Sequence, residues 1–278
     1  MTVMPVFTSA APALTMAELS FPLPSVMLVT INRERAMNAI PMAGHWEGQA
    51  IWDWFDGEPS LTVAVLTGKG HKSFSAGADL MEVRSRTSDK SLSPRYMPPG
   101  GFFGISRRVG KKPIIAAVNG FALGGGFEMA LNCDLVIASP TATFGLTEVK
   151  RGLYAAAGGL PRLVRVLGMQ LASELALTGK TLTAEELRHF GFLRVAQSQD
   201  SLLEEAIQTA QDIASQSPDA VIVTRAALRD SWETASVERS SQLIEQRYKK
   251  ALLEGKNLKI GLEAFARKEK PNWVPSQL

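Results

Sequence analysis

The chain has 278 residues, enough for one large domain or two modest ones. Hydrophobic residues make up 45% and charged residues 21%, a balance typical of a folded globular protein and unlike a disordered or fibrous chain. No stretch approaches the roughly 18 uninterrupted apolar residues of a membrane-spanning helix, so we expect no membrane span. The net charge of +3 is too small for a protein that coats nucleic acid.

Metal and disulfide chemistry have little support in the sequence. The single cysteine, Cys133, excludes an internal disulfide and a multi-cysteine metal site. His45, His71 and His189 lack the spacing of a zinc motif, so we expect no metal. The basic excess is local, with nine Lys or Arg against four Glu between residues 239 and 270. That pattern suits a solvated helix face or contact with a small polyanion.

The hydrophobic pattern alternates between strand and helix. Apolar or alternating runs predict strands at 25–31, 61–67, 113–118 and 134–138, and helical spacing predicts helices at 42–55 and 127–132. This order predicts an α/β architecture with a parallel sheet covered on both faces. Residues 85–112 break the pattern with Ser, Pro, Gly and Arg, which indicates a long surface insertion suited to a lid or a pocket wall.

Helices dominate from Thr183 onward. They are predicted at 183–190, where Thr183 and Glu186 form a capping box, and at 200–216, 218–231 and 236–253. We therefore divide the chain into a loose lead-in over 1–20, a core with the functional loops over 21–199, and a helical region over 200–278.

Two loops of small residues stand between predicted strands and helices, at 73–80 and 119–128. The glycine run at 124–126 lacks the spacing of a dinucleotide fingerprint, and the chain has no phosphate loop and no Gly-x-Ser-x-Gly elbow. Small residues let a backbone approach a ligand, and two N–H groups that face one point form an oxyanion hole. Close packing of helix on strand would explain either loop alone, but an acidic residue also follows each of them.

With these loops the chain resembles the crotonase, or enoyl-CoA hydratase/isomerase, superfamily, from about Val26 to Trp273. Four motifs carry the resemblance in order: Ile31-Asn32-Arg33 through Asn38-Ala39, Phe74 to Leu80, Pro113 to Ala138, and Phe144-Gly145-Leu146-Thr147-Glu148. The implied fold is an α/β crotonase-like spiral of strand-strand-helix units. The C-terminal helical region of that fold builds trimers, which often pair into hexamers.

The resemblance implies a reaction and its residues. Ala78 and Gly125 match the two backbone donors to a thioester carbonyl, and Glu128 and Glu148 match the two carboxylates of hydratases. Water addition across a 2,3-double bond needs a base for the water and an acid for C2, roles that we assign to Glu128 and Glu148. The resemblance implies no metal and no redox cofactor. Coenzyme A is part of the substrate and is not a separate cofactor. The alternative interpretation of either glutamate is a solvent-exposed helix residue without a catalytic role.

Further residues match substrate contacts of the family. These are Arg35, Ala36, Met37, Ala76 and Leu80, together with Phe265 and Lys268, which the resemblance places at the adenine and phosphate end of coenzyme A, from the same or a neighbouring subunit. We interpret Asp79 as a helix cap, Asp134 as part of a buried turn and Cys133 as a small core residue.

The chain departs from the common hydratase pattern near the acyl pocket. Thr147 replaces a frequent proline, the segment 154–159 replaces a Pro-Gly pair, and 97–104 resembles an insertion of carnitinyl-CoA dehydratase. A branched or functionalised acyl group is therefore as plausible as a straight one, for example a carnitinyl-like group or the mevalonyl and anhydromevalonyl groups of siderophore assembly.

Alternative functions stay open. The alternatives are an enoyl-CoA isomerase, which usually keeps one carboxylate, a serine hydrolase of similar spiral fold, and a non-catalytic acyl-CoA-binding or RNA-binding relative. The hydrolase lacks a plausible Ser and His pair, and the two glutamates and the modest charge disfavour the non-catalytic relatives.

The last three residues predict a location. Ser276-Gln277-Leu278 resembles the Ser-Lys-Leu peroxisomal import signal, although Gln277 replaces its basic residue. A surface tail on a cytoplasmic protein is the alternative.

Overall fold

The structure is a computed structural model that describes residues 7–88, 96–234 and 236–278. The strands are β1 Ala17–Leu23, β2 Val26–Ile31, β3 Val63–Gly68, β4 Ser73–Ser75, β5 Ile114–Val118, β6 Phe121–Leu123, β7 Leu135–Ala138, β8 Thr143–Gly145, β9 Leu182–Thr183 and β10 Arg194–Val195. The α-helices are α1 Met42–Gly57, α2 Leu80–Ser88, α3 Gly125–Asn132, α4 Gly159–Thr178, α5 Ala184–His189, α6 Leu202–Ala214, α7 Pro218–Glu233, α8 Val237–Glu254 and α9 Lys256–Arg267. Short 3-10 turns occupy Glu34–Ala36, Phe102–Gly104 and Glu148–Arg151.

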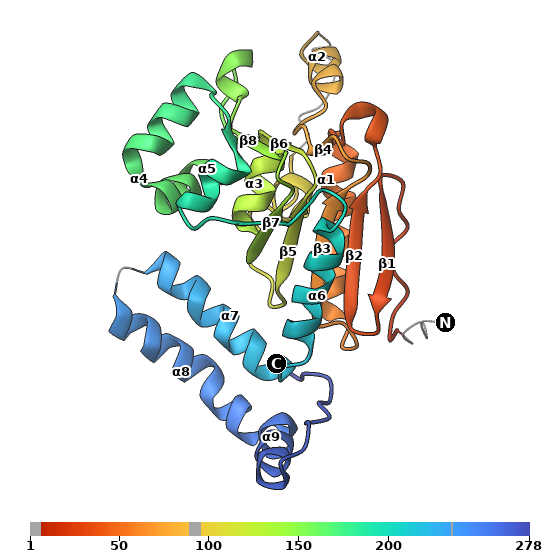
Figure 1. Cartoon of the computed structure of the whole chain (residues 1–278), viewed down its shortest axis with the longest axis vertical. Helices are drawn as coiled ribbons and strands as arrows, with labels where there is room; N and C mark the ends of the chain where they lie inside the picture. Colours follow the sequence, from red (N-terminus) through yellow and green to blue (C-terminus); the bar gives the residue numbers. More distant parts are fainter. Residues whose placement is uncertain (1–6, 89–95, 235) are drawn as a thin grey trace.

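Two sheets form the scaffold. The larger has the order β1-β2-β3-β5-β7-β10, parallel except for the β1-β2 pair, and the smaller has the order β4-β6-β8-β9. The chain alternates between them: β3 and β4 precede α2, β5 and β6 precede α3, and β7 and β8 precede α4. The expected strand-strand-helix repeat is therefore confirmed. Figure 1 shows the sheets at the centre with the C-terminal helices below them.

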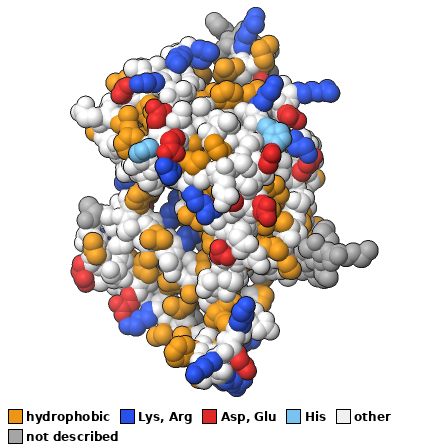
Figure 2. All heavy atoms as spheres, in the orientation of Figure 1, with side chains coloured by type: hydrophobic (Ala, Val, Ile, Leu, Met, Phe, Trp, Pro, Cys, Tyr) orange, Lys and Arg blue, Asp and Glu red, His pale blue; other side chains and the backbone are white. Residues whose placement is uncertain are grey.

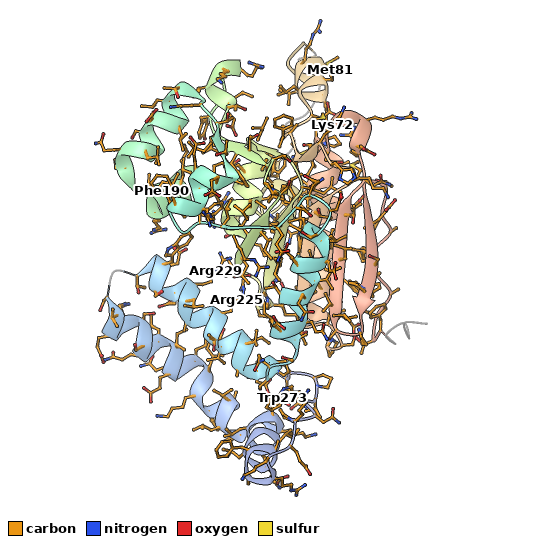
Figure 3. All side chains as sticks on the ribbon, in the orientation of Figure 1. Lys72, Met81, Phe190, Arg225, Arg229 and Trp273 are labelled. Carbon is orange, nitrogen blue, oxygen red and sulfur yellow. The ribbon has the colours of Figure 1, made fainter. Side chains whose placement is uncertain are left out.

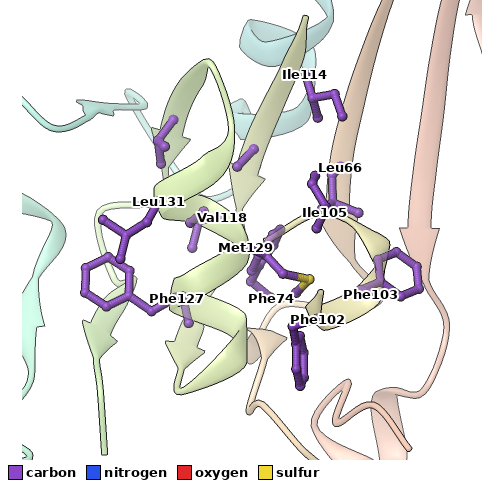
Figure 4. Packing of buried hydrophobic residues seen from close by; sticks show 14 of the residues in the cluster. Leu66, Phe74, Phe102, Phe103, Ile105, Ile114, Val118, Phe127, Met129 and Leu131 are labelled. Carbon is purple, nitrogen blue, oxygen red and sulfur yellow. The ribbon is translucent and has the colours of Figure 1, made fainter. Parts of the chain in front are cut away.

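The central strands β2, β3 and β5 of the larger sheet are buried on both faces, because a hydrophobic cluster covers each side. Alternate residues point to opposite faces of a strand, so Met27, Val29 and Ile31 enter the main core, whereas Val26 and Leu28 pack in a second cluster with Ala206 and Ala210 of α6. This double cover explains why the strands read as continuous apolar runs. The main core extends between the two sheets and includes Phe74, Phe127 and Met129 (Figure 4).

Most predicted elements are confirmed. The strands near 25–31, 61–67, 113–118 and 134–138, the helices near 42–55 and 127–132, and the helices from 183 onward lie within a few residues of the prediction. The capping box is present, with Thr183 N donating to Glu186 Oε2 at 2.7 Å and Glu186 N donating to Thr183 Oγ1 at 3.2 Å. The expected loose lead-in is wrong for residues 17–20, which belong to β1 and pair with β2. The sequence reading did not predict β4, β6, β8, α4 or α9.

The surface insertion expected at 85–112 is wrong for residues 100–106, all of which are buried. They form a turn against α1 and reach the main core through Phe102, Phe103 and Ile105 (Figure 4). Glycines at 100, 101 and 104 give this segment the composition of a surface loop, but their small size permits close packing. Residues 89–95 of the expected insertion lie outside the described part of the chain.

An ion network joins α7 to the core. Asp134 accepts hydrogen bonds from Ile114 N, Arg225 and Arg229, with a shortest distance of 2.9 Å to each. Asp134 therefore organises the turn that the sequence predicted, but this turn is half-buried rather than buried. Figure 3 shows Arg225 and Arg229 extending from α7 toward the sheet. Beside them, Figure 2 shows a hollow with basic side chains, which corresponds to a cavity of about 600 Å³ between α4, α7 and α8. Within the described ranges, no helix is long and apolar enough to cross a membrane.

Candidate active site

Three short strands bring the predicted site residues to one edge of the smaller sheet. β4, β6 and β8 are parallel neighbours, so their carboxyl ends lie side by side. The segment 76–78 follows β4, α3 with Glu128 follows β6, and Glu148 follows β8. Gly124 N donates to Gly145 O at 2.8 Å and locks two of these ends together. The fold thereby joins two glutamates that lie 20 residues apart in the sequence.

Two N–H groups beside this edge have no acceptor among the described residues. A Cβ on Gly77, which has a φ of +89°, would lie 2.8 Å from Leu123 O and 3.3 Å from Gly125 N, so the segment 76–78 lies directly against the start of α3. Gly77 N and Asp79 N donate to Ser75 Oγ and Ile40 O. Among the described residues, no acceptor is present for Ala78 N or Gly125 N. Gly125 is also the first residue of α3, where the helix dipole favours negative charge.

Glu128 lies on the first turns of α3 and is only 3% exposed. Its Oε1 accepts hydrogen bonds from Ala157 N at 2.9 Å and Gly159 N at 2.8 Å. Burial raises the pKa of Glu128 to about 7, outweighing these bonds, and the charge of Glu148 adds to the rise. Gly159 is required here because a Cβ would approach Glu128 Cγ to 2.6 Å. The loop that departs from the common hydratase pattern therefore orients Glu128.

Glu148 opens the 3-10 turn after β8 and lies over the start of α3. A Cβ on Gly124 would be 3.1 Å from Glu148 Oε1, and in the described part of the molecule Glu148 Oε2 is buried without a partner. Burial raises the pKa of Glu148 as well. Burial and a neighbouring like charge both disfavour ionisation, so the site favours retention of a proton by a carboxyl group. One carboxylate can then accept a proton while the other carboxylic acid donates one.

The segment 35–37 lies beside this edge. Met37 O accepts hydrogen bonds from Ala76 N at 3.0 Å and Ser73 Oγ at 2.8 Å, while Arg35 is exposed to solvent. Ala36 is half-buried, and Leu80 is exposed where α2 begins. The segments predicted to contact substrate at 35–37 and 76–80 are thus brought together.

Asp79 behaves as the sequence predicted. Its Oδ1 accepts a hydrogen bond from Met81 N at 3.1 Å at the start of α2, and its Oδ2 pairs with Arg33 at 3.1 Å. These contacts leave Asp79 in a capping role.

Phe265 and Lys268 are not brought to the site within one chain. Phe265 lies on α9 and Lys268 caps its C-terminus, at the opposite end of the molecule from α2 (Figure 1). The Phe265 side chain is 86% exposed and lies on an outer surface. The sequence analysis left open whether Phe265 and Lys268 come from the same subunit or a neighbouring one. A contact with this edge from the same subunit does not fit the structure.

Sequence reasoning missed the covering of Gly125 by Phe102. A Cβ on Gly125 would lie 2.5 Å from the Phe102 ring, so the ring sits directly on the residue that carries one free N–H group. The composition of 85–112 indicated a surface insertion suited to a lid or a pocket wall, and it gave no signal for this contact. In the described residues, no cluster of His, Cys, Asp and Glu is arranged to hold a metal ion.

Comparisons with known proteins identify the family of the chain. The family model described as enoyl-CoA hydratase/isomerase matches residues 24–276. The chain is 48% identical over 272 residues to mevalonyl-coenzyme A hydratase sidH of Aspergillus fumigatus, covering 98% of this chain and 99% of the relative. It is 34% identical over 256 residues to carnitinyl-CoA dehydratase of Escherichia coli, covering 90% and 95%. The crystal structure of enoyl-CoA hydratase from Mycobacterium tuberculosis superposes with a TM-score of 0.84 at 33% identity, covering 94% of this chain and 99% of that chain.

The raised pKa of Glu128 predicts how stability depends on pH. The carboxyl titrates near 4.3 when unfolded and at about 7 when folded, so the folded state holds a proton that the unfolded state releases. Its contribution is complete below the unfolded pKa and is lost as the pH rises through about 7. We expect Glu128→Gln to gain up to about 3 kcal/mol of unfolding free energy relative to the native chain between pH 4.5 and pH 8.

Urea unfolding at several pH values and fixed protein concentration measures this difference. Glu204→Gln, at an exposed position on α6, is the matched control and should show little change with pH. A Glu128→Gln curve parallel to the native one across this range would contradict the assigned burial and protonation of Glu128.

Proposed function

We propose that this chain, which belongs to the enoyl-CoA hydratase/isomerase family and is a hydro-lyase of the enoyl-CoA hydratase type, acts on a functionalised acyl-CoA thioester. The observation that carries the proposal is the glutamate pair beside two free N–H groups. This arrangement contains a proton donor, a proton acceptor and a site for a developing oxyanion. These are the elements that reversible water addition requires.

In the proposed reaction the thioester carbonyl oxygen accepts hydrogen bonds from Ala78 N and Gly125 N. Glu128 takes a proton from water while the water oxygen bonds to C3, and the electrons of the double bond move toward the carbonyl as an enolate. Glu148 then gives its proton to C2. Dehydration is the reverse, with the hydroxyl leaving C3 as water and the two glutamates exchanging roles. No electron transfer occurs, so the step needs no redox cofactor.

The local geometry supports the assignment of the two roles. The hydrogen bonds from Ala157 and Gly159 hold one oxygen of Glu128, which leaves the other free to accept a proton from water. Among the described residues Glu148 Oε2 has no hydrogen-bond partner, so it is available to donate a proton to C2. Arg35, Ala36, Met37, Ala76 and Leu80 stay proposed contacts for the coenzyme A portion.

For the acyl group we propose a branched, hydroxylated chain of the mevalonyl type, interconverted with its dehydrated product. The similarity to a mevalonyl-coenzyme A hydratase and to a carnitinyl-CoA dehydratase supports this choice over a straight fatty acyl chain. The altered loop at 154–159 also supports it, because that loop shapes the surroundings of Glu128.

Substitution of either glutamate tests the mechanism. We expect Glu128→Gln and Glu148→Gln each to lower kcat by about 10²- to 10⁴-fold, because each removes one proton transfer, with thioester binding nearly unchanged. Mass spectrometry with labelled water, on straight, branched and hydroxylated thioesters, measures turnover and identifies the substrate. A shifted double bond without label would favour an isomerase, and near-native turnover in either variant would contradict the two-carboxylate mechanism.

We also propose that the chain assembles as a homotrimer or hexamer through its last helices. Val237 on α8 and Leu262 on α9 are 83% and 61% exposed, and a cavity of about 720 Å³ beside α7 has Leu135 and Leu228 in its lining. The face of α6 that carries Leu202, Ala206 and Ala210 does not contribute, because it packs on the chain's own larger sheet. Light scattering at micromolar concentration should give the mass of three or six chains, and a monomer would contradict the proposal.

For location we propose the peroxisome, with Ser276–Leu278 as the import address. In the folded chain Ser276 Oγ donates to Asp219 and Lys111 Nζ donates to Leu278 O, so a receptor must release the tail before reading it. A fluorescent protein that carries residues 269–278 should give a punctate signal, lost when the last three residues are deleted. A diffuse signal from the intact fusion would rule this address out.

A further inference from the structure

The buried turn at Phe102–Gly104 has an unfavourable backbone conformation. Gly101, Phe103 and Gly104 have φ values of +75°, +50° and +62°. Glycine adopts such values freely, but a residue with a side chain is strained in the left-handed region. Phe103 can keep this conformation only if its surroundings hold it there.

Helix α1 supplies the groups that hold the turn. Phe103 N donates to His45 Nδ1 at 3.1 Å, Gly100 N donates to Gln49 Oε1 at 2.8 Å, and Trp52 Nε1 donates to Phe103 O at 2.9 Å. The three side chains are spaced four and three residues apart, so they share one face of α1. This face satisfies buried backbone groups that would otherwise be costly.

Close packing gives the turn a single position against α1. A Cβ on Gly48 would lie 2.2 Å from Phe103 O, and a Cβ on Gly104 would lie 2.3 Å from Gln49 N. Neither place has room for a side chain, so the turn and the helix touch backbone to backbone. A shift of the turn therefore cannot occur without breaking the hydrogen bonds from α1.

The position of this turn determines where the Phe102 side chain lies. The His45 ring contacts the Phe102 ring with centroids 4.5 Å apart, and a Cβ on Gly125 would lie 2.5 Å from Cδ2 and Cε2 of Phe102. The Phe102 ring thus contacts both His45 and Gly125. Phe102 belongs to the main core cluster, which also includes Phe74 and Met129 (Figure 4).

We propose that His45 is a positioning residue that acts through Phe102 to hold the Gly125 N–H group in line with the thioester carbonyl. This inference rests on the proposed function, since it takes Gly125 as an oxyanion donor. The benefit of such a donor depends steeply on its placement, because a displacement of about 1 Å can cost about 10²-fold in rate. Burial lowers the pKa of His45 to about 4, so its Nδ1 stays free to accept at neutral pH.

Two substitutions of His45 distinguish the effect of its hydrogen-bond acceptor from the effect of its ring. His45→Phe keeps an aromatic ring against Phe102 and leaves Phe103 N without an acceptor. His45→Asn places an amide oxygen near the position of Nδ1 and removes the ring. Trp54→Phe is the matched control, because Trp54 lies on the same helix and donates to Ser9 O at 3.2 Å, away from the turn.

The readout is the infrared carbonyl stretch of a carbon-labelled, unreactive saturated acyl-CoA bound to each protein, together with kcat and the affinity for free coenzyme A. A carbonyl held by two aligned donors is polarised and absorbs at lower frequency. We expect His45→Phe to lose much of this shift and about 10- to 100-fold in kcat, with coenzyme A affinity unchanged. His45→Asn should restore most of both, and Trp54→Phe should match the native protein.

A folded His45→Phe protein with the native carbonyl shift and native kcat would overturn the inference. If His45→Phe does not fold, Phe102→Leu removes the ring while keeping His45 and its hydrogen bond, and the same loss of carbonyl shift is expected. Native values in Phe102→Leu would then overturn it. If the native protein itself shows neither a carbonyl shift nor water addition with any thioester, the proposed function is wrong and the inference falls with it.

Discussion

The parallel pairing of β4, β6 and β8 is the constraint on which the site depends. Each strand has only three residues, yet their register places the carboxyl ends at one edge. Three features of the site come directly after these strands in the chain: Ala78 with its free N–H group, the start of α3, and Glu148. Ligand sites commonly form beyond the carboxyl ends of parallel strands, because helix N-termini and loops converge there. A slip of one residue in β8 would carry Glu148 away from Gly124.

Glycines at this edge set distances that side chains would prevent. Gly124 lets the carboxylate of Glu148 approach the start of α3, and Gly159 lets the side chain of Glu128 approach the start of α4. Glu128 is consequently buried and Glu148 half-buried, and burial raises the pKa of each. The same closeness that makes the pair chemically useful lowers stability at alkaline pH, because burying a charge without full compensation is costly.

Much of this arrangement was predictable from the sequence. The longer apolar strands and amphipathic helices have strong periodicity, and the glycine loops with their two glutamates carried the family resemblance. The short strands β4, β6 and β8 have too few residues for a period and were missed. Helix α4 was missed because it begins with Gly159 and contains Gly168, where the backbone departs from helical values.

The site itself was only partly predictable. The pairing of Glu128 with Ala157 and Gly159 joins residues about thirty positions apart, which no local pattern reports. The role of His45 depends on a backbone turn some sixty residues away, and the composition of that turn resembles a surface loop. The prediction for Phe265 and Lys268 was limited in another way. A motif match can propose that a residue contacts the substrate, but it cannot say which subunit supplies that residue.

The most direct test of the account is a high-resolution crystal structure with a bound, unreactive acyl-CoA thioester. The account predicts the carbonyl oxygen within about 3 Å of both Ala78 N and Gly125 N, with the carboxyl groups of Glu128 and Glu148 facing C2 and C3. A thioester whose carbonyl points away from these two N–H groups, or whose reactive carbons lie beyond the reach of both glutamates, would contradict it.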